Sequence, residues 1–275
     1  MEHLIFERQG HVGWLRLNRP DKLNSWTFAM WEEIAKLGEE LVADGDLRAL
    51  VVIGQGRAFS SGIDTSSFNP ANSRGLFAEA GSGAPTEESG DDQLVADITD
   101  IQSCYAWLAE APYPTIAAVR GYALGAGMQL ALACDLRIVA RGTKLGLPEH
   151  RYGLLPDLGG TYWLPRLVGP AKAKELIWTG TRIDAEEALR IGLANRLVRD
   201  DELETEVAKL ADALAAQPPI AVRGSKRAVD AAYGQSLAEG LREAAVSQAR
   251  CIRSADFTEA VSSFAGGRQP EYHNK

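Results

Sequence analysis

The sequence predicts an α/β protein with a helical region at its C-terminal end. Up to about residue 200, short and strongly apolar runs that are typical of strands alternate with segments of helical periodicity. Beyond that point only helical patterns follow. With 275 residues the chain is long enough to bury a substantial core. We therefore expect an α/β body over residues 1–200 and a helical region over residues 201–275.

The body begins with a strand, a helix and a second strand. VGWLRL at 12–17 alternates as a half-buried strand does, whereas LRALVVIG at 47–54 is almost continuously apolar and indicates a fully buried strand. Apolar side chains at i, i+3 and i+4 spacing predict the helix between them, and Asn24 or Ser25 is its expected N-cap. The predicted apolar face of this helix consists of Met30, Trp31, Ile34, Leu37, Leu41 and Val42.

A second succession of strand, helix and strand follows. PTIAAVRG at 114–121 is strand-like, the evenly apolar MQLALAC at 128–134 predicts a buried helix, and LRIVA at 136–140 indicates another buried strand. Residues 68–93, between the two successions, are rich in Gly, Ser, Pro, Asn and acidic residues. They show no clear period, so we predict a mobile loop there.

Helix boundaries are easy to mark in the second half of the chain. Asp184 with Glu187, and Ser236 with Glu239, have the spacing of a capping box. Two consecutive prolines at 218–219 are expected to end a helix. The region after residue 200 is therefore predicted to contain several separate helices.

Composition and charge argue against several classes of function. A net charge of −8 and a pI near 5.2 disfavour nucleic-acid binding, which needs Lys and Arg to neutralise phosphates. No apolar run is long enough to cross a bilayer and the N-terminus does not resemble a secretory signal, so we expect no membrane partner and a cytoplasmic protein. The cysteines are widely spaced and no histidine pair has metal-ligand spacing, so neither disulfides nor a metal site are predicted.

Two glycine-bearing segments follow predicted strands, GRAFSSGID at 56–64 and GYALGAGMQ at 121–129. In the second, Gly125, Ala126 and Gly127 are expected at the N-terminus of the buried helix, where free N–H groups and the helix dipole favour negative charge. Small residues also leave room for a ligand oxygen. Either segment alone would indicate a tight turn, and GYALGAG does not match the GxGxxG pattern of dinucleotide-binding proteins.

The chain resembles the enoyl-CoA hydratase/isomerase, or crotonase, family in three ordered segments: AFSSGID, AAVRGYALGAGMQLALACDLRIVA and LGLPEHRYGLLPDLGGTYWLPRLVG. The likeness extends along nearly the whole chain and includes LNRPDKLNSW near the N-terminus. It implies a crotonase-like spiral of β-β-α units, with a C-terminal helical region that packs between subunits in a homotrimer or a dimer of trimers. It also implies an acyl-CoA thioester as substrate and no separate cofactor, because coenzyme A is part of the substrate.

The resemblance implies that two main-chain N–H groups receive the thioester carbonyl oxygen. In this sequence they belong to Ile63, directly after Gly62, and to Ala126, beside Gly125. An oxygen that becomes an enolate gains most from donors that are already fixed in place, and the loss of one such donor costs about 3–4 kcal/mol of transition-state stabilisation. Because the donors are main-chain groups, the side chain of Ile63 need not be polar.

The resemblance also indicates which acids move protons. The family usually has one glutamate at the position of Gln129 and a second at the position of Glu149. Some of its double-bond isomerases have a further acid at the position of Asp157. An amide cannot act as a general acid or base. Gln129 is therefore expected to orient a ligand or a water, and Glu149 is the expected proton carrier.

Gln129 affects whether isomerisation or hydration is the expected reaction. Isomerisation of a double bond needs one competent base, whereas hydration must also activate and place a water, so Gln129 favours an enoyl-CoA isomerase. An enoyl-CoA hydratase in which Glu149 and Asp157 divide the work remains an alternative. A catalytically weak acyl-CoA-binding protein is a second alternative, of a different class.

Coenzyme A brings phosphate groups that need local cations. By family position, Lys22 is a candidate for this contact, while Ala58, Ser60 and Asp64 flank the region expected to hold the adenine and pantetheine. The family's tail commonly has an E-K-R segment whose lysine reaches the nucleotide. This chain has GGR at 266–268 instead, and whether its arginine replaces that lysine stays open.

Overall fold

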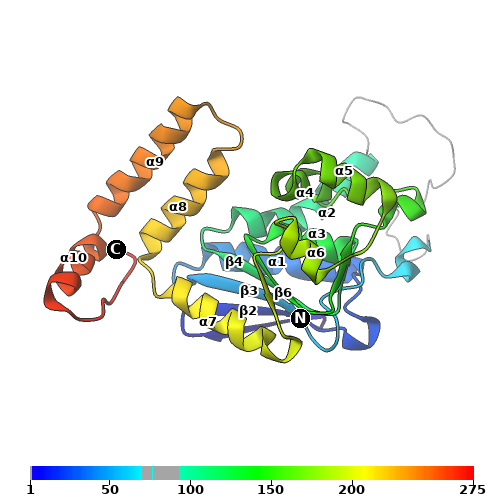
Figure 1. Cartoon of the computed structure of the whole chain (residues 1–275), viewed down its shortest axis with the longest axis horizontal. Coiled ribbons are helices and arrows are strands. Elements are labelled where there is room, and N and C mark those ends of the chain that lie inside the picture. The colour runs from blue at the N-terminus through cyan, green and yellow to red at the C-terminus, as the bar shows by residue number, and fades with distance from the viewer. Residues whose placement is uncertain (1, 70–75, 77–92) are drawn as a thin grey trace.

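The computed structural model describes residues 2–69, 76 and 93–275. Most of the segment 68–93, for which the sequence predicts a mobile loop, lies outside these residues. The described residues form an α/β body and, to one side of it, an arm of helices that leads to the C-terminus (Figure 1). This mixed α/β architecture confirms the predicted fold class.

Strands and helices alternate along the body. The strands are β1 (Leu4–Gln9), β2 (Val12–Leu17), β3 (Ala49–Gly54), β4 (Thr115–Val119), β5 (Tyr122–Leu124), β6 (Leu136–Ala140), β7 (Lys144–Gly146), β8 (Ile183–Asp184) and β9 (Arg196–Val198). The helices are α1 (Phe28–Ala43), α2 (Gln93–Glu110), α3 (Ala126–Ala133), α4 (Gly160–Val168), α5 (Pro170–Thr179), α6 (Ala185–Arg190), α7 (Leu203–Ala215), α8 (Pro219–Ala231), α9 (Leu237–Ile252) and α10 (Ala255–Gly266).

Two sheets organise the body. The larger has the strand order β1-β2-β3-β4-β6-β9, in which β1 is antiparallel to β2 and the pairs that follow are parallel. The smaller has the order β5-β7-β8. After β4 and again after β6 the chain leaves the larger sheet and forms a short strand of the smaller one, β5 and then β7. This repeated step from one sheet to the other produces the spiral that the family resemblance implies.

The larger sheet is covered on both faces. Helices α1, α2 and α3 contribute to the core on one face, and α7 packs on the other (Figure 1). Parallel strands buried in this way have nearly continuous apolar runs, which is why β3, β4 and β6 were predictable. The prediction that β2 is half-buried is wrong: Leu15 and Leu17 face the first core, whereas Val12 and Trp14 pack with α7, which lies far away in the sequence.

Helix α1 begins later than the sequence predicts. Its N-cap is Thr27, whose side chain accepts a hydrogen bond from the Met30 N–H, and not Asn24 or Ser25. The side chain of Asn24 is fully buried and donates instead to two main-chain carbonyls of the turn after β3. The predicted apolar face is buried except for Val42, which is 40% exposed near the end of the helix.

The helical region contains α7, which covers one face of the larger sheet, and the arm, which consists of α8, α9 and α10. Helix α7 ends at Ala215, and Pro219 occupies the first turn of α8. The predicted capping box of Ser236 and Glu239 is present at the start of α9. A salt bridge of 2.8 Å between Lys226 of α8 and Asp135 ties the arm to the body. No helix within the described ranges is both long enough and apolar enough to span a membrane.

Candidate active site

The two glycine-bearing segments lie directly against each other. The Leu124 N–H donates to the Ser60 carbonyl at 3.0 Å, and Ser60 forms a parallel bridge with Ala123. A Cβ atom on Gly62, whose φ of +102° already favours glycine, would lie 2.9 Å from the Leu124 carbonyl oxygen and 3.7 Å from the Gly125 Cα. The absence of a side chain at Gly62 therefore allows the two turns to touch.

The N–H of Ile63 points away from its neighbouring strand segment. The Trp26 N–H donates to the Gly62 carbonyl and the Asp64 N–H donates to the Trp26 carbonyl, both at 2.8 Å. In an extended segment successive main-chain groups point to opposite sides, so the Ile63 N–H faces the opposite side from Trp26. Within residues 2–69, 76 and 93–275 this N–H has no hydrogen-bond acceptor.

The N–H of Ala126 is also free. Ala126 is the first residue of α3, after the N-cap Gly125 with φ 51° and ψ −125°. The first hydrogen bond that α3 closes runs from the Gln129 N–H to the Gly125 carbonyl, at 3.0 Å, so the Ala126 N–H is one of the groups that a helix leaves unpaired. It has no acceptor among the residues that the structure describes. The helix dipole adds positive character at this end.

Glu149 lies beside this helix terminus. It begins a short 3₁₀ helix, Glu149–Tyr152, that follows Pro148. A Cβ atom on Gly125 would lie 3.5 Å from Glu149 Oε1, and the Gln129 amide donates to the same oxygen at 2.9 Å. The other oxygen, Oε2, is buried and has no hydrogen-bond partner in the described part of the chain. Burial, together with the nearby charge of Asp157, raises the pKa of Glu149 to about 7.

Asp157 is the second acid at this site. Its main-chain carbonyl accepts a hydrogen bond of 3.0 Å from Gln102 of α2, and burial raises the pKa of its carboxyl group. The charge of Asp157 in turn raises the pKa of Glu149, so the two carboxyl groups lie within electrostatic range of each other. Both acids that the sequence singled out are therefore shielded from water, and the charge of Asp157 affects the pKa of Glu149.

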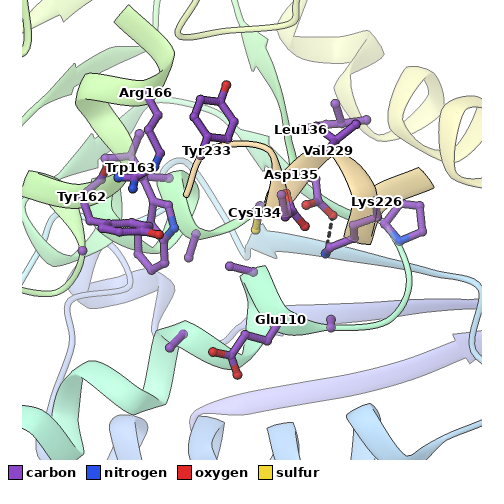
Figure 2. A pocket seen from close by; sticks show the side chains of 18 of the residues that line it. Glu110, Cys134, Asp135, Leu136, Tyr162, Trp163, Arg166, Lys226, Val229 and Tyr233 are labelled. Carbon is purple, nitrogen blue, oxygen red and sulfur yellow. Dashed lines mark hydrogen bonds and ion pairs between the residues drawn. The ribbon is translucent and has the colours of Figure 1, made fainter. Parts of the chain in front are cut away.

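A cleft of about 1360 Å³ opens next to this site, between the body and α8 (Figure 2). Tyr162 and Trp163 of α4 line it, and Arg166 of the same helix lies beside Tyr233, with its guanidinium carbon 5.8 Å from the ring centroid (Figure 2). Asp157 is among the lining residues. The free N–H groups and the carboxyl group of Glu149 are not, so the cleft is a neighbour of the candidate site and not the site itself.

The raised pKa of Glu149 predicts a pH-dependent effect on stability. The folded protein holds this proton up to about pH 7, whereas an ordinary Glu loses it near 4.5. The neutral carboxyl group is therefore tolerated at low pH, and stability is lost as the pH rises through 7. We expect Glu149→Gln to raise the free energy of unfolding by about 2–3 kcal/mol at pH 8 and to change it little at pH 4.5.

Chemical denaturation of both proteins at the two pH values measures this difference. Glu186→Gln, at a side chain that is 54% exposed and pairs with Arg141, is the matched control and should show no such pH dependence. The same gain for Glu149→Gln at both pH values would contradict the assigned pKa.

The residues predicted to hold coenzyme A are in different environments. Lys22 is exposed, but Ala58 and Ser60 are 1% and 0% exposed. The Ser60 hydroxyl donates to the Asn24 carbonyl at 2.8 Å and accepts from the Gly62 N–H at 3.3 Å. It therefore supports the turn that presents Ile63.

Asp64 is likewise engaged with the protein. Arg19 donates to its carboxylate at 2.9 Å. Burial opposes ionisation of Asp64, but hydrogen bonds from Ser66 and Arg19 lower its pKa to about 2. Arg19 is not among the predicted site residues, although it stands in the LNRPDKLNSW segment that carries part of the family resemblance. In the tail, Arg268 pairs with Glu259, with Nη2 and Oε2 2.7 Å apart.

Comparisons with known proteins agree with this architecture. A family model described as enoyl-CoA hydratase/isomerase matches residues 7–275. The chain is 35% identical over 278 residues to a probable enoyl-CoA hydratase of Mycobacterium bovis, which covers 100% of this chain and 99% of that protein. An enoyl-CoA hydratase structure from Bacillus anthracis is 32% identical with a TM-score of 0.87, covering 99% of this chain and 100% of that one.

A structure from Thermobifida fusca, solved in complex with CoA, is 37% identical with a TM-score of 0.79 and covers 91% of this chain and 93% of that one. The matches to the family model and to the Mycobacterium bovis relative both span nearly the whole chain. This chain belongs to the enoyl-CoA hydratase/isomerase family.

Proposed function

We propose that this protein converts an unsaturated acyl-CoA thioester through an enolate, as an enoyl-CoA isomerase or an enoyl-CoA hydratase. One observation carries the proposal: two touching turns each present a main-chain N–H without an acceptor in the described ranges, next to a buried carboxyl group with a pKa near 7. An acid–base group works best when its pKa lies near the working pH. The free N–H groups of Ile63 and Ala126 suit an oxygen on which negative charge develops.

In the isomerisation, Glu149 acts first as a base. Its carboxylate removes a proton from C2 of a 3-enoyl thioester, and the electron pair of that C–H bond moves towards the thioester oxygen. The N–H groups of Ile63 and Ala126 stabilise the enolate. Glu149 then returns the same proton to C4, and the double bond forms between C2 and C3. One carboxyl group is sufficient for both transfers, and no atom is gained or lost.

Hydration is the second candidate reaction, and the names of the similar proteins favour it. A water must then add its oxygen to C3 of a 2-enoyl thioester, while a proton is delivered to C2. Two groups normally share this work, and Glu149 with Asp157 are the pair available at this site. Gln129 cannot replace either of them, because an amide does not exchange protons in this way.

The proposed reaction uses only main-chain N–H groups and carboxyl groups, and coenzyme A enters as part of the substrate. The CoA complex of the Thermobifida fusca structure supports a CoA thioester as the ligand class. We further propose that residues 201–275 contribute to subunit packing in a homotrimer or a dimer of trimers. Large apolar side chains on the arm support this, because Leu237 and Phe264 are 80% and 91% exposed.

A spectrophotometric assay tests the proposed function. Purified protein is offered a 3-enoyl-CoA and, separately, a 2-enoyl-CoA, and the absorbance of the conjugated thioester is followed. Isomerase activity raises the absorbance with the first substrate, and hydratase activity lowers it with the second. Tight binding of both esters with no absorbance change would overturn the enzymatic proposal and favour an acyl-CoA-binding protein.

Asp157→Asn distinguishes the two reactions at the level of residues. If Asp157 takes part in hydration, the variant is expected to lose about 10²-fold or more in hydratase turnover, because one acid–base group typically contributes that much. The expected loss in isomerase turnover is far smaller. Both activities are measured on the same preparation, with thermal unfolding as the check on folding. Equal small losses in both reactions would remove Asp157 from the mechanism.

A further inference from the structure

The side-chain amide of Gln129 connects the proposed proton carrier to helix α4. Gln129 is 1% exposed. Its Nε2 donates to Glu149 Oε1 at 2.9 Å, and its Oε1 accepts from the Gly160 N–H at 3.0 Å. Gly160 is the first residue of α4, so this bond satisfies one of the N–H groups that the helix itself leaves unpaired.

The two bonds fix which end of the amide faces Glu149. A main-chain N–H can only donate, so the amide oxygen faces Gly160 and the NH₂ group faces Glu149. The neutral amide therefore presents a donor to Glu149 at every pH, whereas an ionised carboxylate in its place would repel Glu149. Burial raises the pKa of Glu149, and the hydrogen bond from Gln129 opposes that rise.

The two oxygens of Glu149 are in different environments. A Cβ atom on Gly160 would lie 3.1 Å from Gln129 Oε1, and a Cβ atom on Gly125 would lie 3.5 Å from Glu149 Oε1. Glycine at 160 therefore lets helix α4 approach the amide of Gln129 closely, whereas a Cβ on Gly125 would make an ordinary van der Waals contact with Glu149. Oε2 of Glu149, in contrast, is buried with no hydrogen-bond partner in the part of the chain that the structure describes.

We infer that Gln129 is a positioning residue that holds Oε1 of Glu149 in place and so fixes the orientation of the carboxyl group that takes the substrate proton and returns it. The inference rests on the proposed function, because it assigns a role within that reaction. A lone pair of the Glu149 carboxylate forms the new O–H bond as the C2–H bond breaks, and the same O–H bond breaks when C4 receives the proton. The hydrogen bond between Gln129 and Oε1 is kept throughout.

Gln129→Met is the first test, because methionine has a similar length and lacks the amide donor and acceptor. We expect kcat to fall by about 10- to 100-fold, with KM nearly unchanged, because misplacing a reacting group by up to about 1 Å has an effect of that size. Loss of a hydrogen bond to the charged form should also move the acidic limb of the kcat/KM profile to higher pH, by about one unit.

Gln129→Glu is the second test, and it keeps the size of the side chain and an acceptor for the Gly160 N–H. Its carboxyl group can donate to Glu149 only while protonated, so we expect activity in a window in which the pair shares one proton, with a decline at higher pH. Gln217→Met, at an exposed glutamine whose side chain donates to the Ala213 carbonyl near the end of α7, is the control and should keep the wild-type profile. Wild-type pH profiles in both Gln129 variants would overturn the inference.

A direct titration separates this inference from the proposed function. Glutamate is labelled with ¹³C at the carboxyl carbon, and the Glu149 signal is assigned by its absence in Glu149→Gln. We expect a midpoint near 7 in the wild type and a higher one in Gln129→Met. The measurement needs no substrate: equal midpoints would overturn the positioning role, and a shifted midpoint in a protein without turnover would overturn the proposed reaction alone.

Discussion

Glu149→Gln is expected to lower kcat by about 10²–10⁴-fold, the contribution typical of one positioned acid or base, while binding of the CoA ester is preserved. The reason is that both proposed reactions depend on this carboxyl group. Gln129 cannot act as a general acid or base, and the carboxyl group of Glu149 lies with Oε1 beside the terminus of α3 and with Oε2 buried. A glutamine at position 149 keeps the shape and can still accept the hydrogen bond from Gln129, so the expected loss is chemical and not structural.

The measurement is steady-state turnover of a 3-enoyl-CoA and a 2-enoyl-CoA, with calorimetric binding of a saturated acyl-CoA as the readout of affinity. Glu186→Gln serves as the control again, because Glu186 is exposed on α6 and pairs with Arg141. Undiminished turnover in Glu149→Gln would contradict its role as proton carrier. A loss of turnover and binding together would show that the substitution disturbs the site as a whole.

Ala126→Pro is expected to remove about 3–4 kcal/mol of transition-state stabilisation, or roughly 10²–10³-fold in kcat, because it deletes one of the two proposed oxyanion donors. Proline has no N–H, and the first turn of a helix is where proline is best tolerated. Ala126 is the first residue of α3, so the helix itself loses no hydrogen bond. The change therefore acts on the proposed chemistry with little expected cost in stability.

Two measurements complete this test. Thermal unfolding should show that Ala126→Pro remains folded, and turnover should fall with both unsaturated substrates, since both proposed reactions pass through an enolate. Ala126→Gly changes the side chain but keeps the N–H donor, so it is expected to retain most of the activity. Equal losses in the proline and glycine variants would mean that the side chain, and not the N–H, is what matters at this position.

The sequence predicts the strands of the larger sheet better than it predicts which helices cover them and where those helices begin. The runs that form β3, β4 and β6 are apolar throughout because both faces of the sheet are covered, and this signal is local. The sequence pattern underestimates the burial of β2, because α7, the helix that covers its second face, begins only at Leu203. The N-cap of α1 was also placed wrongly: Asn24 and Ser25 have suitable side chains, but long-range hydrogen bonds engage Asn24, and Thr27 caps the helix.

For the candidate site, the sequence by itself determined which chemical groups are present: a glycine turn before Ile63, a small-residue helix start at Ala126, a carboxyl group at Glu149 and an amide at Gln129. Only the tertiary structure decided how they act on one another. Gln129 meets Glu149 across 20 residues of sequence and Gly160 across 31 residues. The pKa of Glu149 depends on burial by segments that are distant in the chain, and no local pattern encodes burial or a hydrogen-bond partner of that kind.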